Sequence, residues 1–190
     1  IKQLLMICAS EQSVELFRRA AKVRAILVDV DGVLTKGQII RTDAGEQVKI
    51  FNSLDGFGLR LAKFSGYIIA IISASGSEAI RFRAEEIGFD AIYLGSYSKI
   101  EAYRDLKTKF NLDDSQICYV GDDLPDIPLL ELVGLPVAVH NSAADLSAIT
   151  PFQTRRRGGE GAVREVIDFI MFAQGKRDEK VETILKSFGR

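Results

Sequence analysis

The chain has 190 residues, 47% hydrophobic residues and a formal net charge of −1, which together fit one globular domain with a sizeable core. Because 25 basic and 26 acidic side chains nearly balance, no overall basic field favours nucleic acid or an anionic membrane surface as a partner. The two cysteines, Cys8 and Cys118, are too few for a disulfide framework or a thiolate zinc site, so we expect a reducing cytoplasm.

Residues 1–23 are expected to form an N-terminal helical extension. Their apolar patch is only about six residues long, which is shorter than a signal-peptide core or a membrane-spanning helix. We therefore expect no membrane partner.

Apolar runs bounded by turn signals alternate along the chain with segments of helical spacing. Runs of nearly continuous Ile, Val, Leu and Ala suit strands that are buried on both faces. The alternation predicts an α/β fold, a three-layer, Rossmann-like parallel sheet covered by helices. The predicted strands are 24–30, 67–73, 90–95, 117–122 and 135–139, and the predicted helices between them are 56–65, 76–87, 99–110 and 125–133.

Residues 38–51 break this alternation. The stretch QIIRTDAGEQVKIF reads as two short strands around a turn that contains Gly45, which indicates a β-hairpin. A hairpin here can project over the strand tips and exposes an edge that another subunit could pair with. The final section has a glycine-rich loop, an amphipathic helix near 161–173 and a polar C-terminal tail at 176–190.

Two acidic residues, Asp29 and Asp31, stand at the end of the first predicted strand. Like charges one residue apart resist burial, so the pair indicates a bound cation or a reaction. One carboxylate can attack phosphorus to form an aspartyl-phosphate, while the other protonates the leaving oxygen and later deprotonates water.

Further polar residues follow the next predicted strands, and the winding of a parallel sheet brings such positions together at one edge. Carboxylates from different strand ends suit Mg²⁺, and a hydroxyl with a lysine can hold phosphoryl oxygens. The sequence therefore predicts a phosphate-chemistry site for a small-molecule substrate. The residues are Ser73, Lys99, Asp122, Asp123 and Asp126, of which the last two could instead be acids at a helix N-terminus.

The motifs DVDGVLT (29–35) and GDDLPD (121–126), with Ser73 and Lys99 between them, resemble the haloacid dehalogenase superfamily of phosphatases over roughly residues 24–175, the expected catalytic domain. Between the first motif and Ser73 the chain has no room for a cap domain and has only the hairpin in its place, which matches the branch without a cap domain. Its members are typically tetramers whose hairpins and tails close neighbouring active sites. The resemblance implies that Asp29 is the nucleophile and a metal ligand, Asp31 the general acid/base and a ligand through its backbone carbonyl, Ser73 and Lys99 the phosphoryl-binding pair, and Asp122 the residue that completes the Mg²⁺ site.

Within this branch, residues 51–62, 81–89, 158–166 and 173–179 resemble the 3-deoxy-D-manno-octulosonate 8-phosphate phosphatases of lipopolysaccharide biosynthesis. The resemblance implies substrate contacts from Asp55, Gly56 and Arg83, although Asp55 and Gly56 could simply cap the following helix. Leu54 and Ser75 stand where this family usually has arginine, which removes positive charge that could meet a sugar-acid carboxylate. Compensating charge from Arg155, Arg156 and Arg157 is a hypothesis.

Four alternatives stay open at this stage. The same chemistry could act on a nine-carbon, sialic-acid-type phosphate. A phosphorelay receiver domain also combines acids, Ser/Thr and Lys around Mg²⁺, but it has no use for an acid/base such as Asp31. A catalytically silent oligomer would not need the full acidic set, and metal-free dehalogenase chemistry would not need Asp31 as an acid.

Overall fold

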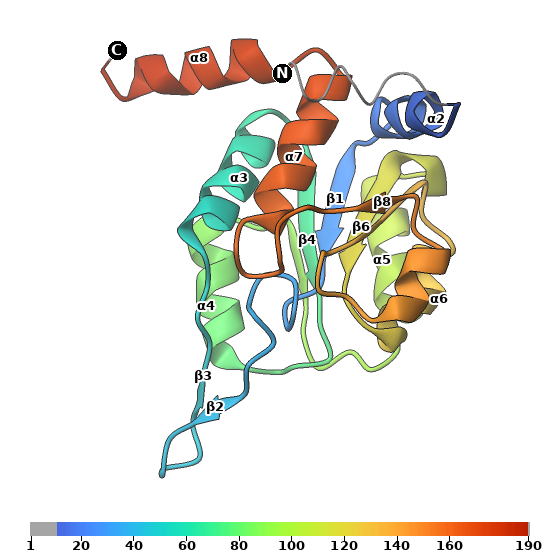
Figure 1. Ribbon diagram of the computed structural model, residues 1–190. Coiled ribbons are helices and arrows are strands. Elements are labelled where there is room, and N and C mark those ends of the chain that lie inside the picture. Colours follow the sequence, from blue (N-terminus) through green and yellow to red (C-terminus); the bar gives the residue numbers. More distant parts are fainter. Residues whose placement is uncertain (1–10, 190) are drawn as a thin grey trace.

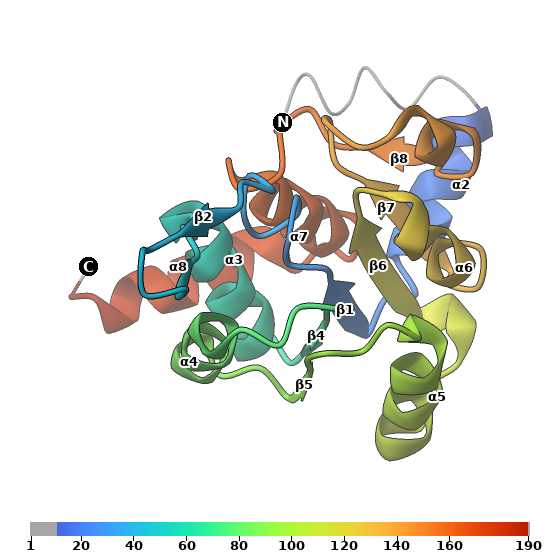
Figure 2. The same ribbon diagram turned by 90° about the horizontal axis from the view of Figure 1, so that it is seen from below.

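The computed structural model describes residues 11–189 and shows a six-stranded, fully parallel sheet between two layers of helices (Figure 1). The strand order is β5-β4-β1-β6-β7-β8, and Figure 2 shows the strands side by side in this order. The predicted α/β, three-layer fold is therefore confirmed. The strands are β1 (Ala25–Val28), β4 (Ile68–Ile72), β5 (Ala91–Tyr93), β6 (Ile117–Gly121), β7 (Leu135–Ala138) and β8 (Phe152–Gln153).

Successive side chains of β1 enter opposite cores, since residues alternate across a strand. Ile26 and Val28 join the larger core, whereas Ala25 and Leu27 join the smaller one. All four residues are fully buried, which explains why these strands lack polar alternation in the sequence. The larger core is covered by α2 (Glu11–Ala20), α3 (Ser53–Phe64), α4 (Glu78–Ile87) and α7 (Ala162–Ala173), and the smaller one by α5 (Lys99–Phe110), α6 (Ile127–Leu130) and the 3₁₀-helix η3 (Ala144–Ala148).

The winding of the sheet changes direction at β1. The chain builds outward from β1 to β4 and β5, then crosses over and continues from β6 to β7 and β8 on the other side. Loops that leave β1 and β6 therefore separate at the carboxyl edge, where open α/β sheets bind ligands.

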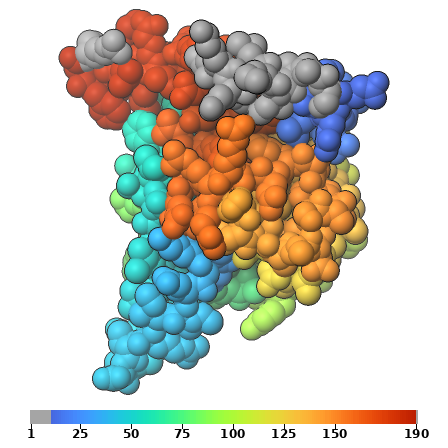
Figure 3. Space-filling model, viewed as in Figure 1, coloured from blue at the N-terminus to red at the C-terminus, as the bar shows by residue number. Residues whose placement is uncertain are grey.

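The predicted hairpin is present as β2 (Ile40–Arg41) and β3 (Gln47–Val48), which pair in antiparallel fashion. It extends away from the body of the molecule, as Figures 1 and 3 show. Gly45 has a φ of +83° in its turn, a conformation that favours glycine. No separate cap domain stands beside the sheet within residues 11–189.

Three elements differ from what the sequence pattern predicts. The stretch expected to be a helix at 125–133 is the 3₁₀-helix η2 (Leu124–Asp126) followed by the four-residue α6, because Pro125 and Pro128 lack backbone donors. Strand β8 is not among the predicted strands, because its two residues are too few to give a periodic pattern in the sequence. The segment expected as a polar tail contains α8 (Arg177–Ser187), whose Val181 and Ile184 pack against the larger core.

The described part of the expected N-terminal extension contains α2, and the expectation for residues 1–10 lies outside the described residues. Phe17 of α2 packs edge-on against Phe169 of α7, with ring centroids 5.2 Å apart. No helix among residues 11–189 has the length and apolar character needed to cross a membrane. A further 3₁₀-helix, η1 (Asp114–Gln116), precedes β6.

Asp55 of α3 ties two helices together. Its carboxylate is buried and accepts hydrogen bonds from the backbone N–H groups of Gly161 (3.1 Å) and Arg164 (2.9 Å) at the start of α7. The N-cap position of α7 is Gly161, which has no side chain to accept these donors. Asp55 therefore acts as the cap of α7 from a neighbouring helix.

Replacing Asp55 by alanine should lower the free energy of unfolding by about 1–3 kcal/mol, because two backbone donors lose their acceptor. Urea denaturation monitored by circular dichroism measures this loss. Asp43→Ala in the exposed hairpin turn is the matched control, and it should change stability by less than about 0.5 kcal/mol. Equal, small effects of both substitutions would contradict the capping role.

Candidate active site

Asp29 and Asp122 lie together because they follow adjacent parallel strands. β1 and β6 pair in register with Val28 opposite Val120, and the backbone N–H of Asp29 donates to the Val120 carbonyl at 3.1 Å. Asp29 is the next residue after β1, and Asp122 is the next residue after β6. The sheet itself therefore places both carboxylates at one point of its carboxyl edge.

The loop after β1 packs directly onto Asp122. A Cβ atom added to Gly32 would lie 1.9 Å from Oδ2 of Asp122, and Gly32 has a φ of +93°. Both the close approach and the backbone conformation require glycine. A second close contact lies behind this loop, since a Cβ on Gly158 would lie 1.6 Å from the Gly32 carbonyl oxygen. The glycine-rich loop before α7 thus holds the β1 loop against Asp122.

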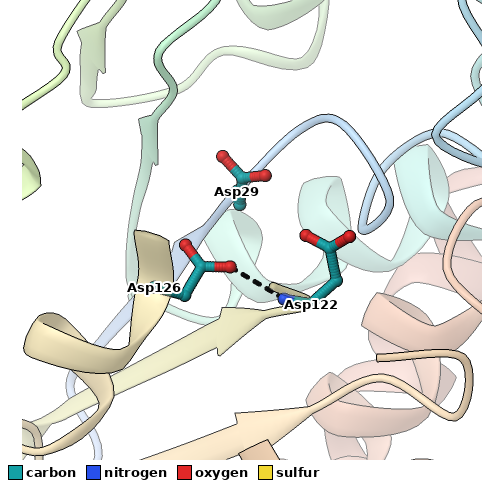
Figure 4. Close-up of side chains that lie close together, drawn as sticks. All are labelled: Asp29, Asp122 and Asp126. Carbon is teal, nitrogen blue, oxygen red and sulfur yellow. Dashed lines mark hydrogen bonds between the residues drawn. The ribbon is translucent and has the colours of Figure 1, made fainter. Parts of the chain in front are cut away.

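Asp29, Asp122 and Asp126 form a cluster in which one oxygen from each residue lies within 4.8 Å of the others (Figure 4). Burial raises the pKa of Asp122 to about 8, and the negative charges of Asp29 and Asp126 contribute further. Burial also raises the pKa of Asp29. The cluster therefore favours anything that neutralises negative charge, either protons or a cation.

Asp126 uses both of its oxygens within the protein. Oδ1 accepts hydrogen bonds from Lys99 Nζ at 2.5 Å and from the Tyr119 hydroxyl at 2.6 Å. Oδ2 accepts from the backbone N–H groups of Asp122 at 2.8 Å and Asp123 at 3.3 Å. Asp126 is 1% exposed, so these contacts fix it in place. Its role is to hold Lys99 and the loop of Asp122.

Lys99 is the first residue of α5, and its ammonium reaches across the sheet edge to Oδ1 of Asp29 at 2.8 Å. Burial alone would lower the pKa of Lys99, but the carboxylates of Asp29 and Asp126 outweigh it and raise this pKa. Lys99 therefore stays cationic beside Asp29. The ammonium contacts two of the three carboxylates, and the third, Asp122, binds a proton below about pH 8 unless a cation takes the place of that proton.

Ser73 follows β4, the neighbour of β1 on its other side, and is buried. Its Oγ accepts a hydrogen bond from the backbone N–H of Ser75 at 3.2 Å. Its position at the same sheet edge agrees with the convergence expected from the sequence. Contact of Ser73 with a phosphoryl group stays a prediction.

Asp31 lies on the β1 loop, and Oδ1 of its carboxylate accepts hydrogen bonds from Lys49 of the hairpin and, at 3.5 Å, from the Thr35 hydroxyl. Its side chain is 38% exposed, in contrast to buried Asp29. Asp31 is therefore the more accessible acid. Its contribution to a metal site through the backbone carbonyl stays a prediction.

Asp55, Gly56 and Arg83, the expected substrate-binding residues, form a separate group. A Cβ on Gly56 would lie 2.2 Å from Nη2 of Arg83, so the absence of a side chain there makes room for the guanidinium. Arg83 also donates to Glu86 at 2.7 Å. No hydrogen bond or ion pair connects these three residues to Asp29, Lys99 or Asp122 in the described chain. Asp55 caps α7, and contact of Asp55, Gly56 and Arg83 with a substrate stays a prediction.

The arginines beside the glycine-rich loop face a different hollow. Arg155 and Arg156 line a cavity of about 690 Å³ together with apolar residues such as Phe152 and Phe169, and none of the clustered carboxylates lines it. Their backbone N–H groups donate to the carboxylate of Glu165 at 3.0 Å each. Leu54 lines the same cavity, and the hypothesis that Arg155, Arg156 and Arg157 supply charge to a substrate carboxylate stays a prediction.

Two residues of the site were missed by sequence reasoning. Tyr119 is a fully buried polar side chain inside a predicted strand, and that unusual placement is the signal that could have found it. Lys49 gives no such signal, because a lysine in a hairpin is ordinarily solvated. Its contact with Asp31 follows only from the path of the chain after β3, which brings Lys49 to the β1 loop.

The donor set fits a divalent cation that prefers oxygen. Asp122 and the second oxygen of Asp29 would be its protein ligands, whereas Asp126 is held by its own hydrogen bonds. Mg²⁺ commonly takes one or two carboxylates and keeps several waters. This arrangement can therefore hold a metal next to a buried carboxylate and a lysine, as phosphoryl transfer requires.

Comparisons with known proteins agree with this geometry. A family model of haloacid dehalogenase-like hydrolases matches residues 46–167. The 3-deoxy-D-manno-octulosonate 8-phosphate phosphatase of Escherichia coli strain K12 is 39% identical over 175 residues, which cover 92% of this chain and 93% of that protein.

Solved structures give the same result. The 3-deoxy-D-manno-octulosonate 8-phosphate phosphatase of Moraxella catarrhalis, crystallised with magnesium, phosphate and 3-deoxy-D-manno-octulosonate (KDO), has a TM-score of 0.86 and 36% identity over 90% of this chain and 98% of that chain. The corresponding enzyme from Yersinia pestis has a TM-score of 0.85 and 38% identity over 86% and 89%. The chain therefore belongs to the haloacid dehalogenase-like hydrolase family, among its phosphatases.

Proposed function

We propose that the protein is a Mg²⁺-dependent phosphatase that hydrolyses 3-deoxy-D-manno-octulosonate 8-phosphate to KDO and phosphate. The observation that carries the proposal is the buried carboxylate of Asp29, which lies 2.8 Å from the Lys99 ammonium and shares a cluster with Asp122. The named substrate of the similar enzymes supports the choice of sugar acid.

In this proposal Asp29 attacks the phosphorus atom, and the bond between phosphorus and the leaving oxygen breaks. Asp31 gives its proton to that oxygen, so the sugar leaves as a neutral alcohol. Water then attacks the aspartyl-phosphate, Asp31 takes the proton of the water, and phosphate leaves Asp29 free for the next cycle. Lys99 and Ser73 hold the phosphoryl oxygens throughout. Bound Mg²⁺ would supply charge neutralisation for the phosphoryl oxygens beside Asp29 and Asp122.

Phosphate release across a panel of sugar phosphates, with Mg²⁺ or with EDTA, tests the proposal. We expect multiple turnovers only with Mg²⁺, and a higher kcat/KM for the eight-carbon sugar acid than for a nine-carbon, sialic-acid-type phosphate. Release of a single equivalent per chain would instead indicate a phosphorelay receiver. A preference for the nine-carbon compound would correct the substrate.

The matched variants for this panel are Asp29→Asn and Asp145→Asn. The first removes the nucleophile and should reduce turnover at least about 1,000-fold, because the covalent route is lost. Asp145 is an exposed acid in η3, and its replacement should leave turnover unchanged. Full activity of Asp29→Asn would refute the mechanism.

Stabilisation by Mg²⁺ should increase with pH. The folded-state pKa of Asp122, about 8, lies above the usual value for an unfolded aspartate, about 3.9, so the folded metal-free protein binds the extra proton. The stability that this proton provides is complete below the unfolded pKa and is lost as the pH rises through about 8. Mg²⁺ binds the deprotonated carboxylate, so the stability that Mg²⁺ adds should be largest at high pH, where the proton on Asp122 has been lost.

Melting temperatures with Mg²⁺ and with EDTA at about pH 5.5 and about pH 8.5 measure this dependence. The Mg²⁺-induced rise should be larger at the higher pH and should shrink in Asp122→Asn. A rise that is the same at both pH values, or that survives the substitution unchanged, would argue against a metal site at Asp122.

We also propose that residues 24–175 form the catalytic domain of a cytoplasmic homotetramer assembled through the hairpins. Four apolar side chains of the hairpin region are exposed, namely Ile39 (75%), Ile40 (38%), Val48 (41%) and Ile50 (63%). Clustered exposure of this kind favours association between subunits. Sedimentation velocity of the full chain should give four copies, and Ile39→Glu should lower this number. A monomer in the unaltered protein would exclude the assembly.

A further inference from the structure

Lys49 is a buried cation on an otherwise exposed hairpin. Its side chain is 1% exposed, although its neighbours Val48 and Ile50 are 41% and 63% exposed. Burying an ammonium is costly unless a charged or hydrogen-bonding partner compensates it. The fold therefore directs this one hairpin side chain inward for a specific contact.

The partner of Lys49 is Asp31. The ammonium donates to Oδ1 of Asp31, and the Thr35 hydroxyl donates to the same oxygen at 3.5 Å. Oδ2 takes part in no hydrogen bond within residues 11–189, and the carboxyl group is 38% exposed. The single hydroxyl proton of Thr35 also has the Val30 carbonyl as a closer acceptor, at 3.3 Å, so Lys49 provides the main contact that holds Oδ1, and Oδ2 is left without a protein partner in that range.

We propose that Lys49 is a positioning residue that orients Asp31 for proton transfer. The inference rests on the proposed function, in which Asp31 gives a proton to the leaving oxygen as its bond to phosphorus breaks. With Oδ1 held by Lys49, Oδ2 is the oxygen that carries this proton to the leaving group. Because Lys49 is anchored by burial, the carboxyl group keeps one orientation and does not sample others.

Leaving groups of different basicity separate this role from a general structural one. A sugar alkoxide is a poor leaving group and needs a proton from Asp31 as it departs. A p-nitrophenolate ion departs without protonation. Loss of a residue that only stabilises the fold or binds phosphate would slow both reactions alike, whereas loss of a residue that aims Asp31 would slow the sugar reaction selectively.

The experiment compares the unaltered protein with Lys49→Met and Lys49→Arg in single turnovers with excess enzyme and Mg²⁺. One reaction uses p-nitrophenyl phosphate, and the other uses the sugar phosphate of the panel that the unaltered protein hydrolyses fastest. Lys49→Met should slow sugar release at least about 10-fold and nitrophenolate release less than about 3-fold, since proton donation by a positioned group contributes about 100-fold or more. Lys49→Arg, which keeps a cationic donor, should recover sugar release to within about 3-fold of the unaltered rate.

The matched control is Arg41→Met, which removes an exposed cation from the paired hairpin strand and should leave the ratio of the two rates unchanged. Equal slowing of both reactions by Lys49→Met, or no slowing, would overturn the inference. If Lys49→Met does not fold, Lys49→Gln replaces it and the same ratio decides. In an Asp31→Asn background Lys49→Met should have no further selective effect.

Failure of the proposed function looks different. In that case the unaltered protein releases neither leaving group with Mg²⁺ present. If the unaltered protein is active but the two rates respond alike to Lys49→Met, the phosphatase function stands and only the role of Lys49 is lost.

Discussion

The contact between Lys99 and the carboxylates of Asp29 and Asp126 is the interaction on which the site depends. Three carboxyl groups meet at the ends of adjacent strands, and one buried ammonium neutralises only part of their charge. Without Lys99 the buried carboxylates would have to bind protons, because charge repulsion and desolvation act in the same direction. With Lys99 alone, Asp122 has no cationic partner and binds a proton below about pH 8, and a divalent cation can take the place of that proton.

The residues around the cluster hold its charged side chains in fixed positions. Tyr119 and Asp126 lie behind Lys99 and hold its ammonium toward Asp29, while the backbone of Asp122 is bound to Asp126. Gly32 and Gly158 have no side chains, so the loop after β1 can pack directly against Asp122 and against the loop before α7. Each contact costs desolvation that a simpler apolar core would avoid, which is the usual trade between stability and function.

Much of the site followed from the sequence because parallel-sheet topology is a strong constraint. Once continuous apolar runs predicted buried strands, the residues after each run had to meet at one edge, and Asp29, Lys99 and Asp122 do so. The capping of α7 by Asp55 was not predicted, because it depends on how α3 packs against a helix more than 100 residues later in the chain. The contact of Lys49 depends on the path of a projecting hairpin, which local periodicity does not specify.

The hairpin joins two functions in one short element. Its exposed isoleucines and valine form an apolar surface, and Lys49, the residue after β3, donates to the carboxylate of Asp31. Within the described chain, β2 and β3 pair only with each other, so the main sheet does not hold the hairpin in place. An isolated two-stranded hairpin has little stability of its own. Whatever fixes this hairpin therefore also fixes Lys49 and, through the contact of Lys49 with Oδ1, the orientation of the Asp31 carboxylate.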